Sequence, residues 1–66
     1  MVEFTEVQEQ VRVYHFPNGE KVTLPGVVSI NVSRSGTHRL NLKDGRKVIV
    51  PSGWLAIEFD ADEWTF

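Results

Sequence analysis

Two segments of the chain are similar to each other, and this internal similarity restricts the fold more than any other feature. Residues 16–33 read FPNGEKVTLPGVVSINVS, and residues 42–60 read LKDGRKVIVPSGWLAIEFD. A shift of 26 positions aligns Gly19 with Gly45, Lys21 with Lys47, Val22 with Val48 and Pro25 with Pro51. One inserted residue near Ser52 then brings the apolar positions that follow into line. The pattern predicts an internal repeat, about 11–33 and 37–60.

The length and composition favour a single small domain that covers residues 1–66. A chain of 66 residues buries only about 60% of the surface that its unfolded form exposes, so its core is thin. The sequence contains no cysteine, which excludes disulfides and fits a reducing, cytoplasmic location. We also find no secretory signal and no apolar run long enough to span a membrane. Self-association, as a homodimer or a larger oligomer, is therefore the most available extra source of stability.

The turn residues predict two hairpins of the same kind. Valine, isoleucine, threonine and aromatic residues alternate with polar ones, which is typical of strands. A three-residue loop that ends on a left-handed glycine suits both PNG and KDG better than a two-residue loop. It predicts three cross-strand pairs: Tyr14 with Val22, Leu40 with Val48, and His38 with Val50.

A proline follows each hairpin and is expected to end its second strand, at Pro25-Gly26 and again at residues 51–53. A third strand with clean alternation comes next in each segment. Its apolar residues are expected to form the core: Val28, Ile30, Val32, Leu55, Ile57 and Phe59. A second set is expected to pack behind them: Tyr14, Phe16, Leu24, Leu40, Leu42, Val48 and Val50.

These elements predict an all-β fold made of two similar three-stranded meanders. Two such units bury their apolar faces against each other, which gives a small barrel or sandwich that is SH3-like or OB-like in size. Residues 2–10 leave two alternatives open. They form an edge strand, or a helical turn in which Thr5 and Gln8 make a capping box.

Catalytic chemistry is not indicated. The chain lacks a cysteine nucleophile, and its serines lie outside any nucleophile-elbow motif. His15 and His38 are expected on the strand surface, and the alternating carboxylates from Glu58 to Asp62 on a solvated face. We therefore predict no catalytic, metal or cofactor site.

A basic segment is one candidate for binding. Five cations lie between residues 34 and 47, with only Asp44 opposing them: Arg34, Arg39, Lys43, Arg46 and Lys47. Basic residues on a β-hairpin neutralise phosphates, and small barrels often bind nucleic acid in this way. Nucleic-acid binding is therefore the alternative function.

Three aromatic residues are the other candidate. Alternation directs Trp54 away from the core, where tryptophan is typical of interfaces. Trp64 and Phe66 either close the end of the core or dock on another chain. The leading hypothesis is a non-enzymatic interaction module that binds a protein partner, itself included. Small, cysteine-free β-domains of this type are common among phage and mobile-element accessory proteins.

Overall fold

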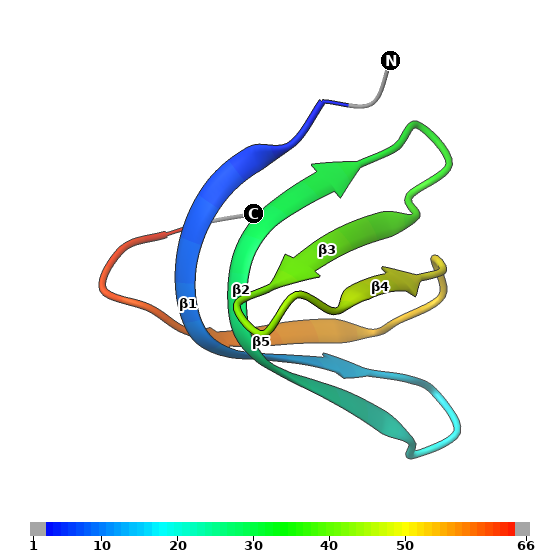
Figure 1. Ribbon diagram of the computed structural model, residues 1–66. Coiled ribbons are helices and arrows are strands. Elements are labelled where there is room, and N and C mark those ends of the chain that lie inside the picture. The colour runs from blue at the N-terminus through cyan, green and yellow to red at the C-terminus, as the bar shows by residue number, and fades with distance from the viewer. Residues whose placement is uncertain (1–2, 65–66) are drawn as a thin grey trace.

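The computed structural model describes residues 3–64, which form one antiparallel sheet of five strands (Figure 1). The strands are β1 (Thr5–His15), β2 (Lys21–Val32), β3 (His38–Leu42), β4 (Lys47–Val50) and β5 (Ala56–Asp60). Their order across the sheet is β4-β3-β2-β1-β5. The all-β class is confirmed, and residues 5–10 belong to a strand rather than to a helical turn. The described part of the chain contains no helix long and apolar enough to cross a membrane.

The two hairpin loops have the same backbone design, as the sequence predicts. In the first, the Phe16 N–H donates to the Glu20 carbonyl at 2.9 Å; in the second, the Leu42 N–H donates to the Arg46 carbonyl at 2.9 Å. Gly19 and Gly45 adopt φ values of 85° and 92°, a region that favours glycine. The three predicted cross-strand pairs, Tyr14 with Val22, Leu40 with Val48 and His38 with Val50, are all present.

Strand β2 runs through Pro25 instead of ending there, so that prediction is wrong. Pro25 lies opposite Val11 of β1, while β3 pairs with β2 only from Val27 onward. The alternation of an antiparallel ladder directs the backbone of Pro25 away from β1. No described strand lies there, so the missing N–H removes no ladder bond. Gly26 follows with φ 64° and accepts a 2.7 Å bond from the Lys43 N–H.

Strict alternation fails in β2, and several predicted core residues are exposed. The buried positions are Leu24, Val27 and Ile30, three residues apart. Gly26, with φ 64°, lies between the first two, and the ladder shifts register between Val27 and Ser29. Val28 and Val32 are exposed, and Leu55, which precedes β5, is 74% exposed. The predictions of Val28, Val32 and Leu55 as core are therefore wrong.

The rest of the predicted core largely holds. The buried apolar residues are Tyr14, Leu24, Val27, Ile30, Leu40, Leu42 and Val50. Partly buried residues pack against them: Val7, Phe16, Val22, Val48, Trp54 and Ile57. Of these thirteen, nine were expected in the core, because the hairpin registers were predicted correctly; Phe59, also expected there, is half-buried.

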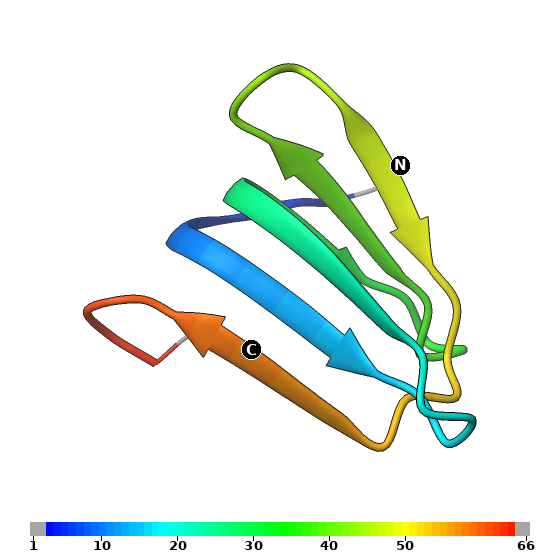
Figure 2. The ribbon, with the colours of Figure 1, turned by 90° about the horizontal axis from the view of Figure 1, so that it is seen from below.

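The fifth strand does not lie beside β4, as a second three-stranded meander would require. It crosses to the other side of the sheet and pairs with β1, from Val11–Asp60 to His15–Ala56. Strands β1 and β2 bend strongly along their length (Figure 1), and β4 and β5 are the two outer strands of an open sheet (Figure 2). The connection from Pro51 to Leu55 therefore joins opposite edges of the sheet.

Candidate functional site

Four hydrogen-bonded polar side chains lie across the core: Glu9, Arg12, Tyr14 and His38. We call them the polar cluster. The Arg12 guanidinium donates from Nε to Glu9 Oε1 and from Nη2 to Glu9 Oε2, both at 2.9 Å. Its Nη1 donates to the Tyr14 hydroxyl at 3.1 Å. The side chains of Arg12 and Glu9 are 0% exposed. This is a two-pronged, fully buried ion pair in a domain of very small size.

The hydrogen bonds of the polar cluster favour one protonation pattern. The Tyr14 hydroxyl lies 2.7 Å from His38 Nδ1. Arginine only donates, so the Tyr14 oxygen accepts from Arg12, and its own proton is available for His38 Nδ1. A neutral His38 then carries its proton on Nε2.

Electrostatics favour the same state. Burial lowers the pKa of His38, and the positive charge of Arg12 lowers it further. Burial raises the pKa of Tyr14, against the opposing effect of Arg12. For Arg12, burial alone would lower the pKa, but the hydrogen bonds to Glu9 and Tyr14 raise it overall. The cluster therefore contains a charged pair, a neutral phenol and a neutral imidazole.

Trp54 closes the polar cluster from the β4–β5 connection. Its ring lies 4.5 Å from the His38 ring and 5.3 Å from the Tyr14 ring, between centroids. The prediction that Trp54 points away from the core is wrong. Leu55 donates its N–H to the His15 carbonyl at 2.7 Å although Ala56 is the residue opposite His15. This bulge interrupts the alternation on which that prediction relied.

The two histidines occupy different environments. His15 lies on the outer face of β1, where its Nε2 contacts Glu58 Oε1, in agreement with its predicted surface position. His38 is only 6% exposed, so the prediction of a surface position for it is wrong. It faces inward because it pairs with Val50 at the buried end of β4.

The polar cluster is saturated. Among the described residues, every buried side-chain nitrogen and oxygen has a hydrogen-bond partner. Two hydrogen bonds join Glu9 and Arg12, which lie three positions apart on β1. A regular strand would direct these two side chains to opposite faces. The ladder of β1 with β2 shifts register between Glu6 and Glu9, just before the ion pair.

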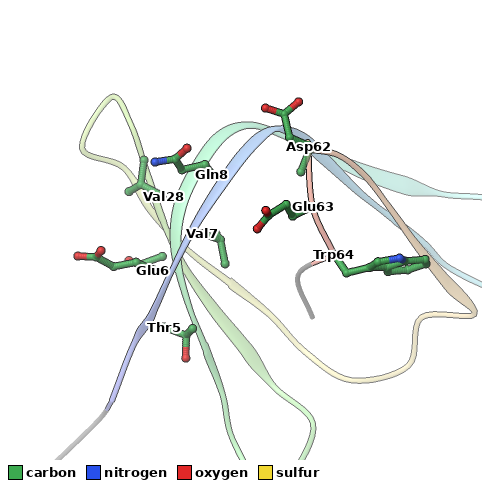
Figure 3. A pocket seen from close by; sticks show the side chains of 10 residues that line it. Thr5, Glu6, Val7, Gln8, Val28, Asp62, Glu63 and Trp64 are labelled. Carbon is green, nitrogen blue, oxygen red and sulfur yellow. The ribbon is translucent and has the colours of Figure 1, made fainter.

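A groove outside the core is the second notable feature, and we call it the tail groove. It has a volume of about 1010 Å³ and lies between β1 and the segment after β5. Its lining residues are Thr5, Glu6, Val7, Gln8, Val28, Ser29, Ala61, Asp62, Glu63 and Trp64. Val7 and Glu63 project into the gap between their two segments, whereas Glu6 projects away from it (Figure 3).

Trp64 is the most exposed large apolar side chain among the described residues. It is 91% exposed, and its ring meets that of Phe59 edge-on at 5.9 Å between centroids. Strand β5 pairs with β1 only at Val11–His15. In the described chain, residues 5–8 therefore have no strand beside them on that side. Trp64 lines the same groove as this open stretch of strand edge.

The structure brings four of the five predicted basic residues onto one hairpin. Arg39 donates to Asn31 Oδ1 at 3.1 Å, and Lys47 donates to Asn41 Oδ1 at 3.4 Å. Arg46 donates to Asp44 Oδ2 at 2.8 Å, and Lys43 lies in the same loop. Backbone and side-chain hydrogen bonds from Arg46 lower the pKa of Asp44. Arg34 lies in the loop at the other end of β3, apart from this group.

Sequence reasoning named Trp64 as a candidate partner-binding residue, which stays a prediction, but it missed the polar cluster. Alternation assigns Glu9 and Arg12 to opposite faces of a regular strand, so the strand pattern does not predict their contact. Phe66, the third predicted partner-binding aromatic, lies outside the described residues. Within residues 3–64 there is no group of three or more potential metal-ligating side chains.

Comparison with known proteins adds no functional information. No protein-family model, curated protein or solved structure matches the chain significantly. Any assignment of function must therefore be argued from the sequence and structure of the chain itself.

Proposed function

We propose that the chain is a non-enzymatic interaction module that binds an extended segment of a protein partner in the tail groove. The observation that carries the proposal is Trp64, which is 91% exposed beside the open edge of β1. A tryptophan left in water on a small domain is unfavourable, and tryptophan is enriched among residues that dominate binding energy. The predicted partner-binding role of Trp64 is thus retained.

The groove supports one mode of binding. An extended peptide adds to an open strand edge through its main chain, and its alternate side chains are read by nearby pockets. Here residues 5–8 supply the open edge, while Val7 and Trp64 supply apolar surface. Asp62 and Glu63 add negative charge on the opposite wall. The expected partner segment is therefore extended and carries both apolar and basic side chains.

Trp54 has a different place in this proposal. Its contacts with Tyr14 and His38 favour a supporting role in the core. Any contact that Trp54 makes with a partner stays a prediction. The small barrel or sandwich and the internal repeat also stay predictions. The matching loops, with the same hydrogen bond and the same left-handed glycine, support the repeat.

The proposal is tested by selecting binders from a library of random short peptides against the wild-type protein. Trp64→Ala serves for counter-selection, and Trp64→Phe is the matched control that keeps an aromatic ring. Enrichment of basic and apolar sequences that bind the wild type and Trp64→Phe, but not Trp64→Ala, supports the tail groove. Peptides that bind Trp64→Ala as well as the wild type, or enrichment of acidic sequences, would contradict it.

Nucleic-acid binding is the second candidate, favoured by the gathering of Arg39, Lys43, Arg46 and Lys47 on the β3–β4 hairpin. Binding of this kind weakens steeply with salt because neutralised phosphates release counterions. The test is an amide-resolved NMR titration with a mixed-sequence oligonucleotide at roughly 50 and 200 mM salt. Shifts at residues 39–47 that fade at the higher salt support this candidate; unchanged spectra at both salt concentrations contradict it.

A further inference from the structure

Strand β4 leaves one side of its backbone open. It is the last strand of the sheet on its side, and no strand within residues 3–64 pairs with its second side (Figure 2). Lys47 is exposed at its start, and Ile49 is 66% exposed in its second half. An apolar side chain on an open edge invites pairing with another chain.

The ladder of β3 and β4 tells which residues present hydrogen-bonding groups at this edge. The Leu42 N–H bonds to the Arg46 carbonyl, and hydrogen-bonded pairs recur at every second residue of an antiparallel ladder. Val48 and Val50 thus use their backbone groups toward β3. Lys47 and Ile49 direct theirs to the open edge. Both side chains lie on the outer face, opposite Asn41 and Arg39.

We propose that two copies of the chain associate through antiparallel pairing of β4 with β4, around a two-fold axis at Val48. In this register Lys47 of each copy lies opposite Ile49 of the other, and these residues exchange their free backbone bonds. Val48 lies opposite Val48 on the inner face. The two lysines avoid direct opposition, and the stem of each covers an exposed isoleucine.

The other open edge does not fit β4 in this way. Ala56 and Glu58 lie opposite His15 and Val13, so alternation directs the backbone of Ile57 and Phe59 to the free side of β5. These two side chains face inward, toward the core and Arg12. Antiparallel pairing of β4 with β5 would place Lys47 on the same face as Ile57. When β4 pairs with β4 of a second copy, the outer faces of the two sheets lie on the same side.

The dimer is expected to be weak. Four residues from each copy bury far less than the roughly 1,200 Å² of a stable interface. We expect a dissociation constant on the order of 10⁻⁴ M, which is weak for a specific complex. The association is therefore reversible and depends on protein concentration. It involves a different surface from the tail groove and does not rest on the proposed function.

Opposite charges at one position test the register. Ile49→Glu places a carboxylate opposite Lys47 of the second copy in both symmetric pairs, whereas Ile49→Lys places lysine opposite lysine. Each opposed pair changes the free energy modestly, so we expect roughly 2- to 30-fold tighter dimerisation for I49E and a similar weakening for I49K. The neutral reference is Ile49→Thr, and the measurement is sedimentation equilibrium at low salt. Equal weakening by both charges, or a wild type that stays monomeric at about 1 mM, overturns the proposal.

A mixed isotope-labelled NMR sample tests the axis directly. Val48 of the two copies forms a pair without hydrogen bonds, in which the Cα atoms lie about 4.5 Å apart. An intermolecular Val48–Val48 α-proton contact is expected, whereas contacts from β4 to β5 overturn the proposed pairing. Trp64→Ala, which removes the tail-groove aromatic, is expected to dimerise like the wild type. Loss of dimerisation in that variant would show that the tail groove, not β4, joins the copies.

Discussion

The polar cluster and the tail groove place their most conspicuous side chains in opposite environments. Arg12 is completely buried, and its described side-chain hydrogen bonds go to Glu9 and Tyr14. Trp64 is almost completely exposed, and its one described ring contact is with Phe59. The cation of Arg12 lies in the core, where an apolar residue is expected. The apolar ring of Trp64 lies on the surface, where a charged residue is expected. The contrast teaches that here the core depends on polar pairing, while apolar surface remains available for binding.

The largest expected effect comes from breaking the ion pair. Arg12→Ala leaves the Glu9 carboxylate buried without this partner and is expected to cost about 3–5 kcal/mol. A domain of this length has a total stability of roughly 3–10 kcal/mol, so the variant should be largely unfolded. Urea denaturation followed by circular dichroism measures this. The paired replacement Glu9→Leu with Arg12→Met should recover most of the loss; a double variant as unstable as Arg12→Ala would contradict the ion-pair explanation.

Removing the indole over the polar cluster should have an intermediate effect. Trp54→Ala deletes the contacts with Tyr14 and His38 and is expected to cost about 1–3 kcal/mol, less than for a fully buried tryptophan. Thermal unfolding measures the loss. Leu55→Ala is the matched control, since Leu55 is the next residue in the chain and its side chain is 74% exposed. Equal melting temperatures for both variants would show that Trp54 contributes no more to stability than an exposed residue.

Stability should depend on pH through His38. Its pKa is lowered in the folded protein, so below about 6.5 the unfolded chain binds more protons than the folded one. The stabilisation is complete above that pH and is lost as the pH falls toward the folded pKa, with a slope of at most about 1.4 kcal/mol per pH unit. His38→Phe should remove this slope between pH 5 and 7. His15→Gln should retain it, and a slope that follows His15 instead would refute the assignment.

The smallest effect on stability is expected at the tail groove. Trp64→Ala should change the free energy of unfolding by no more than about 0.5 kcal/mol, because its side chain contributes little buried area. The same variant should lose peptide binding. Chemical denaturation beside a binding assay separates the two properties. A destabilisation as large as that of Trp54→Ala would erase the contrast between the two regions.

The sequence allowed the hairpins to be predicted because their determinants are local. A proline or lysine, an Asx residue and a glycine specify the loop, and the loop sets the register of Tyr14 with Val22 and of Leu40 with Val48. The core prediction failed where alternation was interrupted, between Gly26 and Ser29 and before Ala56. Neither shift has a local sequence signal strong enough to place it. Glu9 and Arg12 could not be paired in advance because alternation assigns residues three positions apart to opposite faces. Trp64 was proposed from its residue type and acidic surroundings, and its role stays a prediction.

The pairing of the first strand with the last has a kinetic consequence. The hairpins between β1 and β4 join residues close in the chain, but β5 joins β1 across forty or more intervening positions, from the pair His15–Ala56 to the pair Val11–Asp60. Contacts of such long separation slow folding, typically to milliseconds or seconds for small β-domains. We expect the four-strand meander to form early and β5 to join last. During synthesis, the partner strand for Val11–His15 is thus supplied only after the rest of the sheet has left the ribosome.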